Sequence, residues 1–508
     1  MRFERAELIG TGTERNFYRY EVLSKADSVT DTGGTKATSG RHTPRFRLLQ
    51  ITDIQLADLS SPNRFEFVNK LAEIEEAKPF IPGHRPSELL TLHAAIASIE
   101  KANSIHDRRR VDVALFTGDL IDSSQLNEAE AIVSILEGGE VDPGVLFGSY
   151  QGVQGPFIDD YFYYKPEAPS DLMGDRFGFP RIKGLLEASL ASQRSPGLTM
   201  PWLVANGNHE VLIQGMGAVN HEASSHATRD RKPIGFKPTD INYALLAKGY
   251  EADPTSLFPI VDSVVIEPLG SRRALLEGEL GAMIRNAKGE PKGHGLTDYI
   301  SGEFNYLSYF GDGDFVVIAL DSANRAGGAR GRVSKSAYVI LEENLTKAHR
   351  DFPTALIVVI SHHSLSEIDF EEGEITLGQI ESILNRYKVL LWLSGHTHKD
   401  RVVDNITNPN RSFIEVTSAS IADWPSSIRE IEVFDDAVNG KLVINLRSHV
   451  VSEGATTGDM RAIESGELSE LVAVHAAIAT NSASLLNVDV EAEVLKPLSI
   501  EVPRERYL

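Results

Sequence analysis

The amino-acid sequence predicts an α/β fold in which sheets and helices are layered on one another. Short apolar runs that resemble buried strands recur along the chain, and each ends in glycine or polar residues. Helix-like patterns lie between several of these runs, and such alternation is typical of α/β layering. Beyond residue 389 the strand-like runs follow one another closely, which indicates a mixed or second sheet.

Nine apolar, β-favouring runs are expected to be strands. They cover residues 46–52, 111–117, 201–206, 314–320, 355–361, 389–394, 413–419, 429–434 and 441–447. Four segments are expected to be helices because their apolar residues recur with helical spacing. These segments are 87–104, 127–136, 335–351 and 376–387. A further helix is expected in the tail after residue 462.

The chain is expected to have three parts. Residues 1–45 resemble one or two strands followed by a flexible linker rich in Gly, Ser, Thr and Asp. Residues 46–460 form the main domain, which contains two long intervals of weak periodicity at about 138–200 and 211–303. Both intervals flank the strand at 201–206, so we expect them to lie near each other as a cap. Residues 461–508 are expected to form a helical tail.

The composition excludes several classes of protein. The 508 residues are 42% hydrophobic and 24% charged, which is ordinary for a globular protein. No run approaches the roughly 18 apolar residues that a membrane span requires, so we expect no membrane partner. The net charge of −22 argues against a nucleic-acid partner. The absence of cysteine excludes disulfides, thiolate nucleophiles and cysteine-type zinc sites.

The N-terminus lacks the apolar region of a secretory signal, which favours a cytoplasmic location. An exported form whose leader is absent from this chain is the alternative. The sequence leaves the oligomeric state open.

Polar residues with metal-binding side chains follow five of the predicted strands. In chain order they are Asp53 and Gln55, Asp119 and Asp122, Asn208 and His209, His362 and His363, and His396 and His398. In an open α/β sheet, groups just beyond the carboxyl ends of the strands converge on one crevice. Their oxygen and nitrogen atoms suit first-row divalent metal ions and are poorly suited to a core.

With these residues the chain resembles the calcineurin-like metallophosphoesterase superfamily. The pattern of that family is D-x-H, G-D-x-x-D, G-N-H-[DE], H and G-H-x-H. Four blocks are intact and in order, namely Gly118-Asp119 to Asp122, Gly207-Asn208-His209-Glu210, His362, and Gly395-His396-Thr397-His398. The first block departs, because Gln55 stands where the family has histidine. The resemblance covers residues 46–136, 200–212 and 304–450 approximately. It implies a βαβ sandwich of two mixed sheets flanked by helices, with the large insertions as a cap.

The resemblance also implies a site for two divalent metal ions. Asp53, Gln55 and His398 would hold the first ion. Asn208, His362 and His396 would hold the second, and Asp119 would bridge both. His209 would protonate the leaving group, with Asp122 as the partner that orients it. Mn²⁺ is favoured, with Fe, Zn, Ni and Co as alternatives. Two divalent ions would make the site positive within an acidic protein and so attract an anionic substrate.

The implied activity is that of a metal-dependent phosphoric ester hydrolase. A metal-bridging hydroxide would attack phosphomonoesters of small molecules, and phosphodiesters are a further candidate substrate class. The alternative is a non-catalytic metal-binding or interaction protein on the same fold. A nuclease of the same superfamily fits less well, because the chain is acidic and has no tract rich in lysine and arginine.

Gln55 is the most unusual feature of this pattern. Its neutral amide is a weaker and harder ligand than imidazole, so we expect a lower affinity at the first metal site and a shift toward ions such as Mn²⁺. The sequence leaves open whether the amide would bind the ion directly or through water.

Three further residues are weaker candidates. His363 is expected beside the metal ligands rather than among them. Arg325 belongs to a glycine-rich turn, where a solvated arginine is favoured over one that reaches a substrate phosphate. His221 could line the pocket, but the irregular interval around it gives no position.

Overall fold

The computed structural model describes residues 43–71, 84–237, 249, 254–296, 302–370, 375–404, 408, 411–455, 461–485 and 497–508. Most of the N-terminal segment expected over residues 1–45 lies outside this range. Its last three residues begin the first strand, β1 (Thr43–Ile51).

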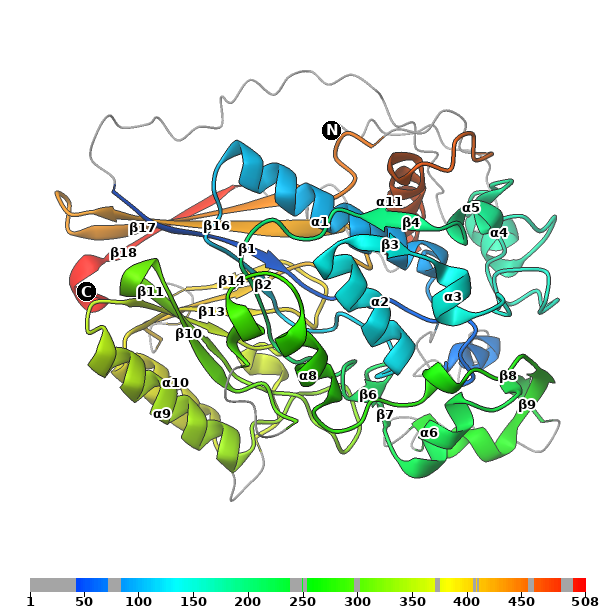
Figure 1. The fold of residues 1–508 in the computed structure, drawn as a ribbon, viewed down its shortest axis with the longest axis horizontal. Helices are drawn as coiled ribbons and strands as arrows, with labels where there is room; N and C mark the ends of the chain where they lie inside the picture. The colour runs from blue at the N-terminus through cyan, green and yellow to red at the C-terminus, as the bar shows by residue number, and fades with distance from the viewer. Residues whose placement is uncertain are drawn as a thin grey trace.

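Two six-stranded sheets form the centre of the molecule (Figure 1). The first has the order β18 (Leu498–Pro503), β17 (Lys441–Val450), β16 (Ser427–Asp436), β1, β2 (Val113–Phe116) and β5 (Trp202–Val204). The second has the order β10 (Tyr306–Phe310), β11 (Phe315–Ala319), β12 (Leu356–Ile360), β13 (Val389–Ser394), β15 (Ile414–Thr417) and β14 (Arg401–Val403). Both sheets mix parallel and antiparallel pairs. Each of the nine runs predicted as strands contains one, which confirms the predicted α/β class with two mixed sheets.

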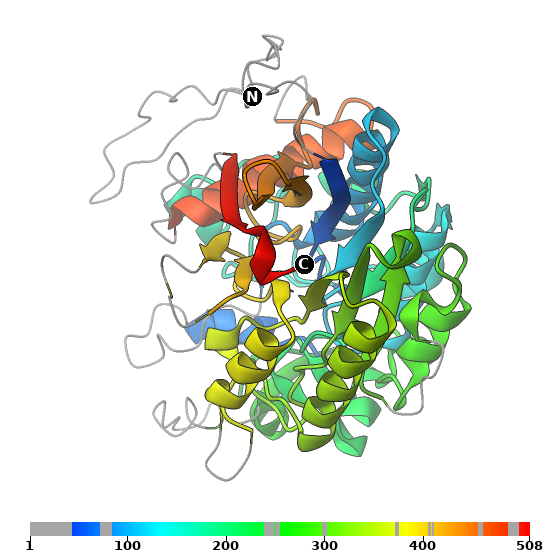
Figure 2. The same ribbon diagram turned by 90° about the vertical axis from the view of Figure 1, so that its left-hand side faces the viewer.

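Helices cover the outer faces of the two sheets. The helices α9 (Lys335–Asp351) and α10 (Leu377–Arg386) pack against the second sheet through apolar side chains such as Leu345 and Ile380. The helices α1 (Thr91–Arg108) and α2 (Leu126–Glu137) lie over the first sheet. Figure 2 shows these layers from the side, with α9 and α10 below the strands and α1 above them. All four helices coincide closely with the predicted segments.

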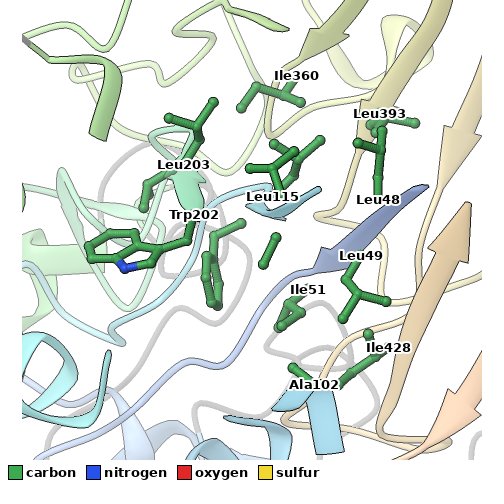
Figure 3. Close-up of a cluster of buried hydrophobic side chains, with 14 of the residues drawn as sticks. Leu48, Leu49, Ile51, Ala102, Leu115, Trp202, Leu203, Ile360, Leu393 and Ile428 are labelled. Carbon is green, nitrogen blue, oxygen red and sulfur yellow. The ribbon is translucent and has the colours of Figure 1, made fainter. Parts of the chain in front are cut away.

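The main hydrophobic core lies between the two sheets and continues under α1. In Figure 3, Leu48 and Leu115 of the first sheet lie toward Leu393 of the second. Ile51 lies on the opposite face of β1, beside Ala102 of α1. Successive residues of a strand point to opposite faces, so a strand that is buried on both sides reads as a continuous apolar run. This burial explains why the central strands are prominent in the sequence.

The two insertions are folded segments that contact each other. The first holds the hairpin of β3 (Gly139–Val141) and β4 (Gln193–Ser195) and the short helices α3 (Pro143–Phe147), α4 (Leu172–Phe177) and α5 (Leu185–Ser189). The second holds the pairs β6 (Leu212–Ile213) with β7 (Gly217–Ala218) and β8 (Arg231–Phe236) with β9 (Val261–Val265), and the helices α6 (His221–Ala227) and α8 (Glu279–Asn286). Val153 and Tyr163 of the first insertion pack against Ile234 and Val264 of the second. That they cap the site remains a prediction.

The C-terminal segment differs from the helical tail expected over residues 461–508. Its helix α11 (Leu468–Leu485) is present, but the chain then returns to the first sheet, where β18 pairs antiparallel with β17. Only Ile500 and Val502 of β18 are buried, and they alternate with exposed residues. An edge strand with so few apolar residues gives a weak signal in the sequence. Within the residues that the structure describes, every helix is too short or too polar to cross a membrane.

Two buried histidines lie in α1 and α11. His93 is fully buried, and neither of its ring nitrogens forms a hydrogen bond within the described residues. His475 has Nε2 3.2 Å from the carbonyl oxygen of Ala422. Burial lowers the pKa of His93 to about 3 and that of His475 to about 4. Both side chains are therefore neutral in the folded protein at neutral pH.

These histidines predict a loss of stability in acid. As the pH falls below 6.5, His93 takes up a proton in the unfolded chain but not in the folded one, so the free energy of unfolding decreases. At pH 5 this loss is about 2 kcal/mol for His93. Urea unfolding at pH 7.5 and pH 5 should show a smaller acid-induced loss for His93→Leu than for the wild type. Equal losses in the two proteins would contradict the assignment.

Candidate metal centre

The predicted ligands lie in loops that directly follow β1, β2, β5, β12 and β13. The three strands of the first sheet are parallel neighbours, and so are the two strands of the second. The backbone N–H of Asp53 donates to Gly118 O at 3.1 Å, which joins the first two loops. The backbone N–H of His396 donates to Asp53 Oδ2 at 3.0 Å, which joins the two sheets. The structure therefore brings the five loops to one place between the sheets.

Five of the predicted site residues have a left-handed backbone. They are Asp53, Gln55, Asp119, His396 and His398, with φ between 48° and 70°. They make up five of the eleven non-glycine residues with positive φ in the described part of the chain. Such conformations cost on the order of 1–3 kcal/mol each and cluster at functional sites. Their concentration here supports a functional role for these loops.

Asp53, Gln55 and His398 lie together on one side of the site. Asp53 Oδ1 is 3.2 Å from His398 Nε2, and Gln55 Nε2 is 3.4 Å from the same nitrogen. His398 Nδ1 donates a hydrogen bond of 2.6 Å to Asp423 Oδ2. A carboxylate in this position fixes the tautomer and orientation of a metal-binding imidazole. Asp423 was not predicted from the sequence.

Asp119, Asn208, His362 and His396 lie on the other side. His362 Nδ1 donates to Thr117 O at 2.8 Å, which directs Nε2 toward Asp119 Oδ2 at 3.1 Å. Asn208 Nδ2 donates to the carbonyl oxygen of Gly215 at 2.8 Å and thereby leaves Oδ1 for another partner. The rings of His362 and His396 have centroids 5.2 Å apart. Ligand atoms of Asp53, Asp119 and His362 all lie within 4.8 Å of one another.

Four buried atoms in this cluster form no hydrogen bond within the described residues. They are Asp53 Oδ1, Gln55 Oε1, Asn208 Oδ1 and His362 Nε2. Buried polar atoms nearly always have a partner. The three oxygens carry lone pairs, and His362 Nε2 offers one when the ring is neutral with its proton on Nδ1. A metal ion that binds His362 would therefore displace the Nε2 proton. A set of converging oxygen and nitrogen lone pairs is what divalent cations such as Mn²⁺ or Zn²⁺ require.

The charges of the cluster are consistent with a cation site. Burial raises the pKa of Asp53 and of Asp119, but the neighbouring histidines outweigh this effect, so both pKa values lie below the usual range. Burial lowers the pKa of His362, but Asp119 and Asp53 raise it to about 10. Burial also lowers the pKa of His398, but Asp53 and Asp423 raise it to about 9. The two buried carboxylates thus stay ionised and attract positive charge.

His209 lies beside this cluster, with its ring held by Asp122. His209 Nδ1 donates to the backbone carbonyl of Asp122 at 2.7 Å, whereas the Asp122 carboxylate is 3.8 Å away. That carboxylate accepts from Arg64 Nη1 at 2.6 Å. His209 Nε2 lies 3.1 Å from Gln55 Nε2 and 3.7 Å from Asp119 Oδ2. Asp122 therefore orients His209 through its main chain, which differs from the expectation that its carboxylate does so.

Glu210 and two glycines shape the loops. The Glu210 carboxylate accepts from the backbone N–H groups of Gly207 at 2.7 Å and Asp119 at 2.9 Å, so it ties two of the loops together. Gly118 has φ of 93°, and a Cβ at this position would lie 2.7 Å from His362 Nδ1. A Cβ at Gly395 would overlap the carboxylate of Asp53. These glycines let the ligand loops approach one another closely.

The three weaker candidates lie around the cluster rather than within it. His363 packs against His396, with ring centroids 4.5 Å apart, and both of its ring nitrogens contact protein groups, Ser322 Oγ and Ala329 O. Arg325 pairs with Asp321 at 3.0 Å and donates to Gly302 O. His221 is exposed at the start of α6. His363 thus lies beside the metal ligands, where it was expected, and ligand atoms of His362, His363 and His396 lie within 4.8 Å of one another. The contacts of Arg325 and the exposed position of His221 give no support for a role in substrate binding.

Comparisons with known proteins add little to this description. Neither the protein-family models nor the curated proteins contain a match to this chain. Among solved structures, a dimetal phosphatase from Danio rerio is similar over 79% of this chain and 95% of its own, with 12% sequence identity and a TM-score of 0.36. A TM-score this low is too weak to support a shared fold or function. The interpretation of the site depends on its own residues.

Proposed function

We propose that this protein is a dinuclear-metal phosphoesterase of the calcineurin-like metallophosphoesterase superfamily. Its substrates would be phosphomonoesters of small molecules, with phosphodiesters as a further class. The observation that carries this proposal is the set of four buried oxygen and nitrogen atoms that form no hydrogen bond within the described residues and come from the separate loops after β1, β5 and β12. The order of the five sequence blocks supports it independently.

In this proposal the chain holds each ion with a defined set of side chains. Asp53, Gln55 and His398 hold the first. Asn208, His362 and His396 hold the second, and Asp119 contributes to both. When bound, the two ions supply Lewis-acid activation of a water nucleophile and of the phosphoryl group.

His209 acts on the leaving group. The Nδ1–H bond to the Asp122 carbonyl holds the ring in place and directs Nε2 into the site. In the proposed role the imidazolium gives its Nε2 proton to the departing oxygen and is left as the neutral ring with its proton on Nδ1. The carboxylates of Asp119 and Asp122 lie 3.7 and 3.8 Å from the two ring nitrogens, so both edges of the imidazole face negative charge.

A test is hydrolysis of phenyl phosphate and of bis(4-nitrophenyl) phosphate by the full chain. The protein is treated with a chelator and then supplied separately with Mn²⁺, Fe²⁺, Zn²⁺, Ni²⁺ or Co²⁺. We expect hydrolysis that depends on added metal, with the highest rate in Mn²⁺. The absence of metal-dependent hydrolysis of either compound would favour the non-catalytic alternative.

Gln55 gives a second prediction. Replacing it with histidine provides an imidazole nitrogen where the amide lies 3.4 Å from His398 Nε2, so the affinity of the weaker metal site should rise by about tenfold or more. Titration of metal-free protein with Mn²⁺ measures this affinity, and His398→Gln should lower it. An unchanged affinity in Gln55→His would mean that Gln55 is not a ligand.

A further inference from the structure

Arg85 lies beside the candidate metal centre, on the side that is open to solvent. Its Nε is 3.4 Å from Asp423 Oδ2, the same oxygen that accepts from His398 Nδ1. The side chains of Arg85 and Asp423 are 30% and 32% exposed, and that of His398 is 17% exposed. On the opposite side, His362 and Asp119 are completely or almost completely buried, whereas His396 is partly exposed. Arg85 therefore lies on a solvent-accessible edge of the site, next to the partly exposed His398.

Within the described residues, the guanidinium of Arg85 is held only through Nε, by Asp423. Neither Nη1 nor Nη2 of this arginine donates a hydrogen bond to any residue that the structure describes. The neighbouring Arg64 is different, since it is fully buried and binds three carboxylates, those of Glu66, Glu88 and Asp122. Two parallel N–H donors of a guanidinium match the paired oxygens of a carboxylate or phosphate.

The backbone around Arg85 is fixed. Its carbonyl oxygen accepts from the N–H of Glu88 at 3.1 Å, and the carbonyl of Pro86 accepts from Gln154 Nε2 at 2.9 Å. His84 Nδ1 lies 3.1 Å from Glu88 Oε2. A side chain that starts from a fixed backbone loses less entropy when it binds a ligand.

Arg85 is positioned to reach the outer part of a substrate rather than its scissile phosphoryl group. The guanidinium contacts the Asp423 carboxylate, which in turn binds His398 Nδ1. The other ring nitrogen, His398 Nε2, is the atom that faces Asp53. A carboxylate and an imidazole ring thus separate the guanidinium from the metal-facing atom. Arg64 links Arg85 to the His209 region, because it pairs with Asp122, whose carbonyl holds His209, and with Glu88, whose N–H donates to the Arg85 carbonyl oxygen. In the proposed function His209 faces the leaving group, so Arg85 lies near the same part of the substrate.

We propose that Arg85 binds a second anionic group carried by the leaving group of the substrate. This inference rests on the proposed phosphoesterase function and refines its substrate class. The preferred substrates are phosphomonoesters whose organic part bears a carboxylate or a further phosphate.

The test compares substrates that differ by one anionic group. Phenyl phosphate and 4-carboxyphenyl phosphate differ only in the carboxylate. A third substrate, 1,4-phenylene bisphosphate, carries a second phosphate in its place. The ratio of kcat/KM for each anionic substrate to that for phenyl phosphate is measured in wild type, Arg85→Gln and Arg85→Lys. Arg504→Gln is the matched control, because Arg504 pairs with Asp435 at the far end of the first sheet. Comparison of ratios between variants removes the intrinsic reactivity of each substrate.

We expect Arg85→Gln to lower the ratio about tenfold or more for at least one anionic substrate and to change kcat/KM for phenyl phosphate less than threefold. The ratio for Arg85→Lys should fall between those of the wild type and Arg85→Gln, and the ratio for Arg504→Gln should match that of the wild type. Calorimetry with phenylphosphonate and 4-carboxyphenylphosphonate, which are not hydrolysed, gives the same comparison as binding affinities.

Unchanged ratios in an active Arg85→Gln enzyme would overturn the inference while leaving the proposed function intact. An equal loss on all substrates together with a loss of bound metal would also overturn it, because Arg85 would then act only by positioning Asp423. Failure of the wild type to hydrolyse any of the compounds would instead contradict the proposed function.

Discussion

Replacement of Asp119 by asparagine is expected to lower kcat/KM by about a thousandfold or more and to remove bound metal. Asp119 is almost completely buried, with Oδ2 3.1 Å from His362 Nε2. Asparagine has the same shape but loses the negative charge and can present an N–H group to the cations. Loss of metal activation costs several kcal/mol, and each 1.36 kcal/mol corresponds to tenfold in rate.

The fold should survive this change. Asp119 Oδ1 accepts from the backbone N–H of His209 at 3.0 Å, and an asparagine oxygen can do the same. The loop is also held by Glu210 through the backbone N–H of residue 119. Circular dichroism and thermal unfolding check the fold, and Asp435→Asn is a matched control outside the site. An Asp119→Asn protein that keeps metal and activity would show that this carboxylate is not a ligand.

Replacement of His209 by glutamine is expected to lower kcat by about 10²–10⁴-fold on phosphomonoesters of poorly acidic alcohols. The effect should be much smaller on 4-nitrophenyl phosphate, because its leaving group departs without protonation. Metal content should stay at the wild-type level, since the role proposed for His209 is proton transfer rather than metal binding.

The decisive readout for His209 is the dependence of kcat on the acidity of the leaving group. A steeper dependence in the variant than in the wild type identifies a lost general acid. His449→Gln, which alters a histidine that pairs with Glu430 in the first sheet, is the control. Equal losses across all leaving groups would mean that His209 acts on ground-state binding or on the fold instead.

The central strands and the ligand loops could be predicted from the sequence for one physical reason. A strand buried on both faces is an unbroken apolar run, and a polar side chain directly after it stands out, as Asp53 and Asp119 do. The edge strands β10 and β18 were missed because they have fewer buried residues. In β10 only Tyr306 and Ser308 are buried, and the three residues between and after them are partly exposed, so the strand gives a weaker signal than the central ones.

Residues that support the site from irregular segments could not be predicted. Asp423 lies 25 residues after His398, in a loop without a recurring pattern, and reaches it only through the tertiary fold. Arg64 donates a hydrogen bond to the Asp122 carboxylate, which explains why His209 binds the backbone carbonyl of Asp122 instead. The sequence contains both residues, but periodicity and motif spacing do not indicate that they meet.

The most direct test of the dinuclear centre is the metal content of the reconstituted protein. Metal-free protein is loaded with Mn²⁺, freed of excess ion by gel filtration and analysed by inductively coupled plasma mass spectrometry. We expect two ions per chain in the wild type, with one lost more readily on dilution because Gln55 is a weak ligand, and less than one in Asp119→Asn. Binding of no metal, or equal metal content in wild type and Asp119→Asn, would contradict the assignment of this cluster as a dinuclear site.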